Sequence, residues 1–309
     1  MHSLKRPKNV ASLLKGTLSE EMIDESLLLD YVKTEDYLMV TLEIRPCSFL
    51  TIPAEFQNGD ELGRRIDELC REDFQAVLNA TANEKVFLIR KLKKKIQESF
   101  KKVVLASAVY KTHMEWSRKL FLQTYDVEVR PSIHELYLFK NSKVKKELKR
   151  LLNVRKVARE KVALSMGGSK GKTGLAFAEE ISSDYLASVG KLLGYPSCCV
   201  ERYIHDRLRE DINVEMRASR QVKELRKEGK EPNVYTYFAR NFFPCEPRCR
   251  NASEVGRKTF DLLSGVNPKL GDLYLECVRR NVEMVEKSPE LIGQYREKLT
   301  KKVQKLSRM

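Results

Sequence analysis

Four cysteines in two short motifs are the residues of this 309-residue chain most suited to chemistry. Cys198 and Cys199 are adjacent in GYPSCCVERY, and Cys245 and Cys249 have the spacing C-x3-C in FFPCEPRCRNASEVG. Each pair lies beside a proline and leads into a helical pattern, so both pairs are predicted at helix starts. A helix start presents unpaired backbone N–H groups and a partial positive charge, which favour a thiolate. The pattern predicts one shared site for metal binding or thiol chemistry.

The helical phase after Pro196 separates the two adjacent cysteines. Successive helical residues point about 100° apart, so Cys199 flanks the apolar stripe of this helix while Cys198 points largely away from it. We therefore expect Cys199, Cys245 and Cys249 to be good ligands and Cys198 to be a doubtful fourth. Sulfur atoms sharing one tetrahedral ion should lie about 3.5 to 4 Å apart, since a metal–sulfur bond is about 2.3 Å long.

Three interpretations of the four cysteines stay open at this point. The preferred one is a metal centre, either an iron–sulfur cluster or zinc, with a [4Fe–4S] cluster slightly ahead. The second is a pair of disulfides, which are rare in the cytosol but occur in hyperthermophiles. The third is a set of reduced thiols, either inert or reactive with a resolving partner.

Both cysteine motifs are similar to those of a known family. LLGYPSCCVERY and FFPCEPRCRNASEVG resemble the paired motifs G-Y-P-x-C-C and F-x-P-C-x-P-x-C of the archaeal and bacterial domain of unknown function 483, over about residues 180 to 265. The resemblance implies an archaeal source and no particular reaction, substrate or cofactor. It also implies that the cysteines share one site with the shaping residues Gly194, Tyr195, Pro196, Pro244 and Pro247.

The composition places the chain among proteins with a full apolar core. It is 42% hydrophobic, and it contains neither a run of 18 apolar residues nor a signal-type segment. We therefore expect a cytoplasmic protein without a membrane span. The charged fraction of 33%, rich in Lys, Arg and Glu, is typical of hyperthermophiles, which keeps the disulfide interpretation open.

The net charge of +15 is confined to two segments, Lys85–Lys102 and Lys140–Lys161. Clustered positive charge is the electrostatic footprint of phosphate binding, so RNA or another polyanion is a predicted partner. Solvated helix faces and an acidic protein partner are the alternatives. The candidate anion-binding residues in these segments are Lys93, Lys94, Lys95, Lys145, Lys146, Lys149 and Arg150.

A glycine-rich stretch within Lys161–Glu180 adds Lys170 and Lys172 as phosphate-binding candidates. It is one residue short of the G-x4-G-K-[ST] loop that wraps a phosphate. A β-hairpin with strands VALSM and LAFAE around a glycine turn explains the same letters better.

The remaining patterns predict an α+β fold that is predominantly helical. An N-terminal domain, residues 1–141, is expected to hold small sheet elements within residues 37–53 and 125–139, a helix over residues 60–80, and one long helix or two broken near Ser107. A helical cysteine domain, residues 142–309, should begin with a basic helix and the hairpin. It should continue with a helix capped by Ser182 or Ser183 and closed by Gly194, and its tail should be two helices broken at Pro289.

These expectations combine into one functional hypothesis with two alternatives. The chain is predicted to be a metal-binding four-cysteine protein of unknown reaction that acts on or with RNA. The first alternative is a thiol–disulfide protein with reactive cysteines at helix starts. The second is a non-catalytic RNA-associated protein in which the cysteines are structural. Whether the protein is an enzyme, and its oligomeric state, stay open.

Overall fold

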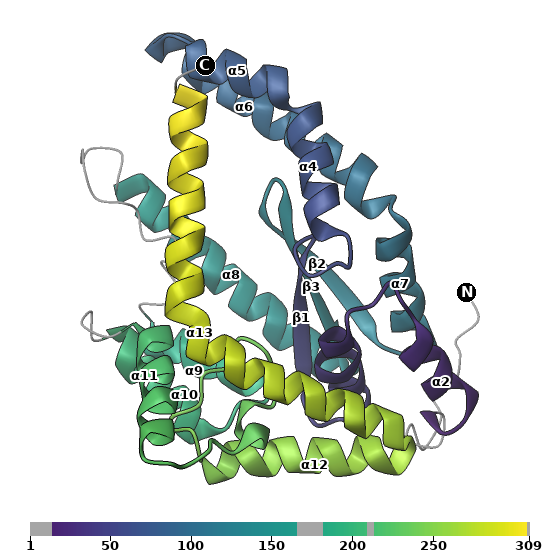
Figure 1. Cartoon of the computed structure of the whole chain (residues 1–309). Helices are drawn as coiled ribbons and strands as arrows, with labels where there is room; N and C mark the ends of the chain where they lie inside the picture. Colours follow the sequence, from purple (N-terminus) through teal and green to yellow (C-terminus); the bar gives the residue numbers. More distant parts are fainter. Residues whose placement is uncertain (1–13, 166–181, 209–212, 308–309) are drawn as a thin grey trace.

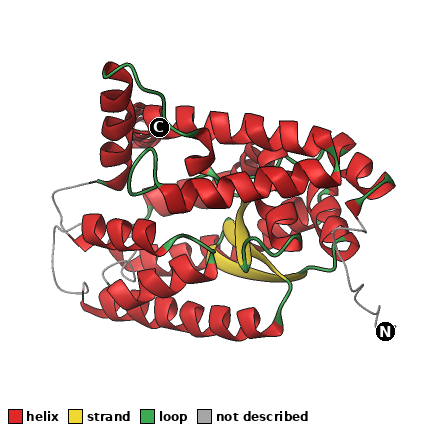
Figure 2. Cartoon of the chain, turned by 90° about the horizontal axis from the view of Figure 1, so that it is seen from below, coloured by secondary structure: helices red, strands yellow, loops and turns green. Residues whose placement is uncertain are grey.

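A small antiparallel sheet lies between layers of helices in the computed structural model, which describes residues 14–165, 182–208 and 213–307 (Figures 1 and 2). Its strands β1 (Cys47–Ile52), β2 (Gln123–Arg130) and β3 (Ile133–Phe139) are ordered β1-β3-β2. Phe139 lies opposite Cys47 on one side and opposite Gln123 on the other. The predicted helix-rich α+β class is confirmed.

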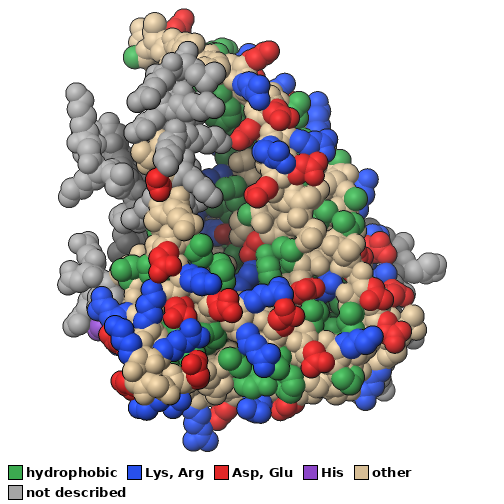
Figure 3. Space-filling model, viewed as in Figure 1, with side chains coloured by type: hydrophobic (Ala, Val, Ile, Leu, Met, Phe, Trp, Pro, Cys, Tyr) green, Lys and Arg blue, Asp and Glu red, His purple; other side chains and the backbone are tan. Residues whose placement is uncertain are grey.

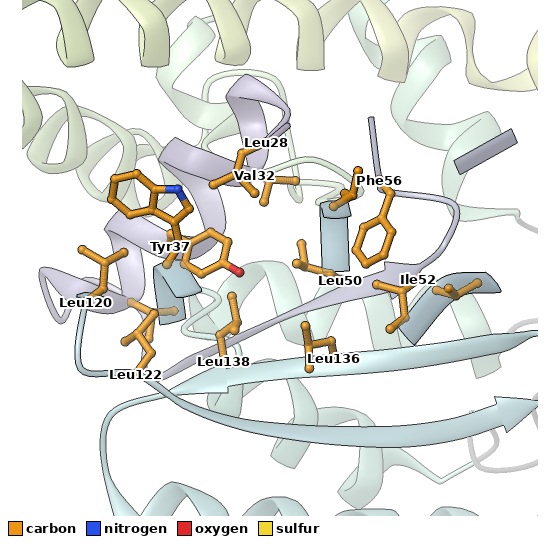
Figure 4. Packing of buried hydrophobic residues seen from close by; sticks show 14 of the residues in the cluster. Leu28, Val32, Tyr37, Leu50, Ile52, Phe56, Leu120, Leu122, Leu136 and Leu138 are labelled. Atoms are coloured by element: carbon orange, nitrogen blue, oxygen red, sulfur yellow. The ribbon is translucent and has the colours of Figure 1, made fainter. Parts of the chain in front are cut away.

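One face of the sheet builds the largest hydrophobic core. Leu50, Ile52, Leu136 and Leu138 alternate with residues of the other face and point into this core (Figure 4). Trp116 and several other residues of the surrounding helices complete it. The elements that contribute are η1 (Val32–Leu38, a π-helix), α4 (Gly59–Leu69), α6 (Ala82–Phe100), η2 (Lys101–Leu105, also a π-helix) and α7 (Ala108–Lys119).

The opposite face of the sheet is covered by α8 (Ser142–Ser165) and α9 (Ser183–Leu192). Tyr137 and Phe139 point to this side and pack with Leu148 and Leu151 of α8 and Leu192 of α9. The two predicted basic segments therefore belong to helices on opposite faces of the sheet, since Leu92 and Phe100 of α6 belong to the largest core.

The C-terminal helices join both halves of the chain. They are α10 (Ser197–Leu208), α11 (Val214–Lys227), the 3-10 turn η5 (Val234–Tyr237), α12 (Arg250–Val266) and α13 (Pro268–Ser307). Leu263 of α12 and Leu270, Tyr274 and Val278 of α13 are buried in the largest core, which is otherwise built from N-terminal residues such as those of α2 (Thr17–Asp24). The division of the chain at residue 141 stays a prediction.

Several predicted helix boundaries are confirmed by their caps. The break near Ser107 is present, and the Ser107 hydroxyl accepts a hydrogen bond from the Tyr110 N–H at 3.1 Å. Ser182 caps α9 in the same way through the Tyr185 N–H. Gly194 follows α9 with φ of 74°, a conformation that suits glycine at a helix end.

One strand is present within residues 37–53 as predicted, namely β1, while residues 37–46 hold the end of η1, α3 (Met39–Thr41) and a turn. Three other local predictions are wrong. The helix predicted over residues 60–80 is broken at Cys70 into α4 and α5 (Arg71–Asn79). Residues 162–165 continue α8, which removes the first hairpin strand, and the rest of the hairpin lies outside the described residues. Pro289 lies inside one continuous α13, which bends between its two halves (Figure 1).

Within the residues that the structure describes, no helix has the length and apolar character needed to cross a membrane. The surface is instead mixed in charge. Figure 3 shows acidic and basic side chains interspersed over the face formed by α12 and the first half of α13.

Candidate metal centre

The two cysteine motifs meet because two helices start beside each other. Cys198 and Cys199 lie in the first turn of α10, and Cys249 is the residue that precedes α12. Cys245 lies in the turn that leads to α12. The four Sγ atoms all lie within 4.8 Å of one another, so one ion can contact all of them.

The sulfur separations match a single tetrahedral ion. The Sγ atom of Cys249 lies 3.7 Å from that of Cys198 and 3.7 Å from that of Cys199. The Sγ atoms of Cys198 and Cys199 are 3.9 Å apart. Four sulfurs around one zinc ion are about 3.8 Å apart, as follows from a bond of about 2.3 Å. The expectation that Cys199, Cys245 and Cys249 share one coordination sphere agrees with this geometry.

The doubt about Cys198 is corrected by the structure, which brings this residue into the same group. The doubt came from the helical phase, which assumes that the site lies against the side of α10. The site lies instead off the N-terminal end of α10. Side chains of a helix lean toward its N-terminus, so two adjacent residues of the first turn can both reach a point beyond that end.

Burial makes free thiolates unfavourable at two of the four cysteines. Cys199 and Cys249 are buried against Met39 and Phe242, whereas Cys198 and Cys245 are half-buried. Burial raises the pKa of Cys199 strongly and that of Cys245 to about 12. Because a buried thiolate is costly without a counter-charge, a metal ion at this point would supply the compensation.

Cys198 differs from the other thiols in its hydrogen bonding. The Asn251 side-chain amide donates to its Sγ at 3.4 Å. Burial opposes ionisation of Cys198, but the hydrogen bonds from Asn251 and from the neighbouring thiols outweigh it and lower the pKa. Asn251 belongs to the first turn of α12. A residue of the FFPCEPRCRNASEVG motif thus donates a hydrogen bond to a sulfur of the GYPSCCVERY motif.

The residues predicted to shape the site hold its backbone in place. The carbonyl of Pro196 accepts hydrogen bonds from the N–H groups of Cys199 and Val200, which starts α10. The Pro247 carbonyl accepts from the Asn233 N–H at 3.1 Å, and the Pro244 carbonyl accepts from Arg217 at 2.8 Å.

The remaining two shaping residues contact distant parts of the chain. Tyr195 packs its ring 4.9 Å from that of Phe242. A Cβ atom at Gly194 would lie 3.1 Å from Pro46 and 3.3 Å from Arg45, so crowding as well as the positive φ favours glycine at this position.

Arg217 of α11 supports the second motif and was missed by sequence reasoning. Its buried guanidinium pairs with Asp206 of α10 at 2.5 Å and donates to the carbonyls of Pro244 and Cys245. Gln221, one turn further along α11, donates to the same Cys245 carbonyl at 3.2 Å. Nothing in the local sequence marks an arginine on α11 as a partner of carbonyls 27 and 28 residues away.

A buried charged cluster holds the other end of the second motif and was also missed. We use this name for Glu35, Asp36, Arg45, Glu55 and Arg240. Arg240 pairs with Asp36 and with Glu55, and its backbone N–H donates to Glu35 at 2.6 Å. Asp36 also lies 3.9 Å from Arg45. The cluster ties the loop before Cys245 to η1 and to the turn after β1.

The predicted anion-binding residues do not form part of the cysteine centre. Lys93, Lys94 and Lys95 are exposed on α6. On α8, Lys146, Lys149 and Arg150 are exposed and Lys145 is half-buried, and Arg150 pairs with Glu147. Lys170 and Lys172 lie outside the described residues.

Comparison with known proteins supports the predicted family. A curated relative, Uncharacterized protein MJ1106 of Methanocaldococcus jannaschii, is 29% identical over 69 residues, which cover 22% of this chain and 36% of the relative. The match thus spans about a third of that relative's own length. No solved structure matches the chain. The family model described as Protein of unknown function (DUF483) matches residues 117–264, which include β2, β3 and all four cysteines.

Proposed function

We propose that this protein binds one zinc ion through the thiolates of Cys198, Cys199, Cys245 and Cys249. The observation that carries the proposal is the close grouping of the sulfurs: the Sγ atoms of Cys198, Cys199 and Cys249 lie 3.7 to 3.9 Å apart, and all four Sγ atoms, that of Cys245 included, lie within 4.8 Å of one another. A [4Fe–4S] cluster would hold the four sulfurs considerably farther apart, because iron and sulfide atoms lie between them. Zinc therefore replaces the iron–sulfur cluster as the preferred occupant.

The proposed role of the ion is structural. Four protein ligands close a zinc site, whereas a catalytic zinc keeps one position for water or substrate. The centre would fix the starts of α10 and α12 to each other, and the two positive helix ends would partly offset the negative charge of four thiolates. All cysteines are free in the structure, which supports metal binding over the disulfide alternative and fits the predicted cytoplasmic location.

Metal analysis of protein purified without oxygen tests the proposal. We expect a colourless protein with one zinc ion per chain. Cys249→Ser should lose this zinc, whereas Cys277→Ser, which changes a buried cysteine outside the centre, should retain it. A brown protein whose visible absorption bleaches on reduction would replace zinc by an iron–sulfur cluster. Two disulfides among the four cysteines without metal would overturn metal binding.

We propose polyanion binding, with RNA as the ligand, as a second function. It is supported by the exposure of Lys93, Lys94 and Lys95 on α6. Each lost phosphate contact should lower the log–log salt slope by roughly 0.7 to 0.9, so replacing the three lysines by Gln should flatten it by about two units. A control with Gln at Lys223, Lys227 and Lys230 should leave the slope unchanged. Equal slopes for the two variants would overturn this proposal.

A further inference from the structure

An aromatic side chain lies exposed on the basic helix α6. Phe87 is 70% exposed, the largest exposed fraction of any large apolar side chain in the residues that the structure describes. Burial of a phenylalanine stabilises a fold, so a displayed ring forgoes this gain. The same helix carries Lys93, Lys94 and Lys95, the residues of the proposed polyanion site. A contact between the ring and that polyanion would explain the exposed position.

The helical phase places Phe87 among cations. Residues three, four and seven positions apart share one face of a helix, so Arg90, Lys91 and Lys94 lie on the face of Phe87. Val86 is one position away and therefore points about 100° to the side. We call Phe87, Arg90, Lys91 and Lys94 the α6 stripe. Seven residues of helix span about 10 Å, which is the length of this stripe.

The α6 stripe faces away from the protein. The apolar residues on the other side of α6 recur at every fourth position, so they form one inner face. These residues are the half-buried Leu88 and Ile96 and the buried Leu92 and Phe100. The first turns of α6 lie beside α5 at one end of the molecule (Figure 1). A long ligand can therefore reach the stripe from solvent.

Most of the cations around the ring are free of ion pairs. Lys91 pairs with Asp73 of α5 at 3.3 Å, and its side chain is still 64% exposed. Arg90 and the lysines at residues 93–95 form no ion pair with any residue that the structure describes. Glu98, one turn beyond these lysines, interrupts the run of positive charge. The stripe therefore offers positive charge that no carboxylate neutralises.

An aromatic ring among free cations suits a single-stranded nucleic acid. The cations contact phosphates, and the face of the ring stacks on an unpaired base. Duplex bases are already stacked on one another, and inorganic polyphosphate has no bases, so neither ligand can use the ring. An acidic protein surface is the competing partner. It would use the exposed Val86 and Ile89 as readily as Phe87, although neither of these residues belongs to the stripe.

We propose that the polyanion bound at α6 is single-stranded RNA and that the Phe87 ring stacks on one of its bases. Arg90, Lys91 and Lys94 contact neighbouring phosphates. This inference rests on the proposed polyanion function, to which it adds the class of ligand and the residue that contacts the bases. Every base has a π-face, so we expect little preference for sequence.

Titration of the full chain with an oligouridylate of about 12 nucleotides tests the proposal. Phe87→Ala should weaken this binding at least fivefold, because stacking of one base on an aromatic side chain changes affinity by roughly 5- to 150-fold. The salt dependence should stay the same, since no phosphate contact is lost. The affinities for inorganic polyphosphate and for duplex RNA should not change. Equal losses for all three ligands would overturn stacking.

Three further variants separate stacking from simple apolar contact. Phe87→Trp should retain the affinity for the oligouridylate, whereas Phe87→Leu, which is apolar without a π-face, should lose as much as Phe87→Ala. Val86→Ala, at a position 58% exposed but outside the stripe, should bind normally. The fold should persist because both positions are exposed. Full affinity of Phe87→Leu, or equal losses in Val86→Ala and Phe87→Ala, would overturn stacking and indicate a surface for a protein partner.

Tryptophan emission detects the stacked base directly. Trp116, the one tryptophan of the chain, is buried, so its emission should not respond to the oligouridylate. The added emission of Phe87→Trp should be quenched by the oligouridylate and not by polyphosphate. Leu262→Trp, at an exposed position on α12, is the matched control and should show no quenching. Equal quenching of the two variants would overturn the assignment to Phe87.

The inference and the function on which it rests fail differently. If neither the oligouridylate nor polyphosphate binds the natural protein at about 50 mM salt, the polyanion function is refuted and the inference with it. If the natural protein and Phe87→Ala bind the oligouridylate equally well, stacking alone is refuted and the polyanion function stands.

Discussion

The cysteine centre and the buried charged cluster fix the two ends of one segment, the loop between η5 and α12, by different means. The cysteine centre joins two motifs about 50 residues apart and draws on four identical side chains. The charged cluster joins Arg240 to Asp36 and Glu55, 204 and 185 residues away. The comparison shows that a site built from one ligand type is visible in sequence, whereas a site built from common charged residues is not.

The two clusters also differ in what they add to stability. Zinc bound by a structural site contributes an apparent 10 to 16 kcal/mol in zinc-finger peptides, because the ion binds only the folded ligands. A buried ion pair gains little net free energy, since the Coulomb attraction mainly offsets the cost of removing both charges from water. Losing one partner is nevertheless expensive. We therefore expect both clusters to be sensitive to removal, and the proposed zinc centre more so.

Removal of the metal should have the largest effect. A strong chelator should lower the free energy of unfolding by several kcal/mol, because four thiols held within 4.8 Å then lose their shared ion. Urea unfolding with and without the chelator measures this change. Hydrogen exchange should increase first at the starts of α10 and α12 and least in β3. Unchanged stability after verified zinc loss would contradict a structural role.

Arg240→Met should follow in magnitude. It leaves the carboxylates of Asp36 and Glu35 buried without their strongest partner, which should cost about 3 to 5 kcal/mol. Arg250→Met is the matched control, since the Arg250 side chain is 90% exposed, and it should change stability by less than about 0.5 kcal/mol. Urea unfolding of the two variants provides the measurement. Similar small effects would show that the charged cluster is dispensable.

The same contrast explains which parts of the fold could be predicted. Ser107, Ser182 and Gly194 mark helix ends through local hydrogen bonds and backbone conformation, so their signals survive in the sequence. Residues 32–38 give no such signal. All seven are buried, including Lys33, Glu35 and Asp36, and Arg240, which binds both carboxylates, lies 205 and 204 residues from them in the chain. A pattern method that expects charged residues outside has no means of finding a buried charged helix.

The candidate site could likewise be predicted only in part from the sequence. The four cysteines were found because their residue type and spacing suit metal ligands. Arg217 was not, because its contacts to the Pro244 and Cys245 carbonyls depend on how α11 packs beside the loop. Tertiary placement, not local sequence, creates these contacts.

Glu35, a member of the buried charged cluster, should make the free energy of unfolding depend on pH. Burial raises its pKa from about 4.5 in the unfolded chain to about 7, although Arg240 opposes this shift. Between these values the folded protein retains a proton that the unfolded chain has lost, so the contribution of Glu35 to stability falls as pH rises from about 4.5 to 7. The contribution of Glu35 to the free energy of unfolding falls by about 3 kcal/mol in total, and this fall is complete above about pH 7.

Glu35→Gln isolates this contribution. The substituted amide does not titrate, so the variant should gain stability relative to the natural protein as pH rises from 5.5 to 8. Urea unfolding at three pH values measures the difference, which cancels the pH dependence of the metal centre because both proteins contain it. Glu201→Gln, at an exposed position, serves as the control. Parallel curves for the natural protein and Glu35→Gln would contradict a proton on Glu35.

Gly194→Ala should give the smallest of these effects and separates two reasons for a glycine beside the cysteine centre. Gly194 and Gly229 have nearly the same positive φ, 74° and 71°, so alanine should cost about 1 kcal/mol at either position through the backbone alone. Only Gly194 is crowded, by Pro46 and Arg45, whereas a side chain at Gly229 meets nothing within 4 Å. Gly194→Ala should therefore be destabilising by about 1 kcal/mol more than Gly229→Ala in urea unfolding. It should also weaken zinc binding, since the start of α10 must shift with the turn. Equal losses in the two variants would mean that the contact between the GYP turn and residues 45–46 does not support the centre.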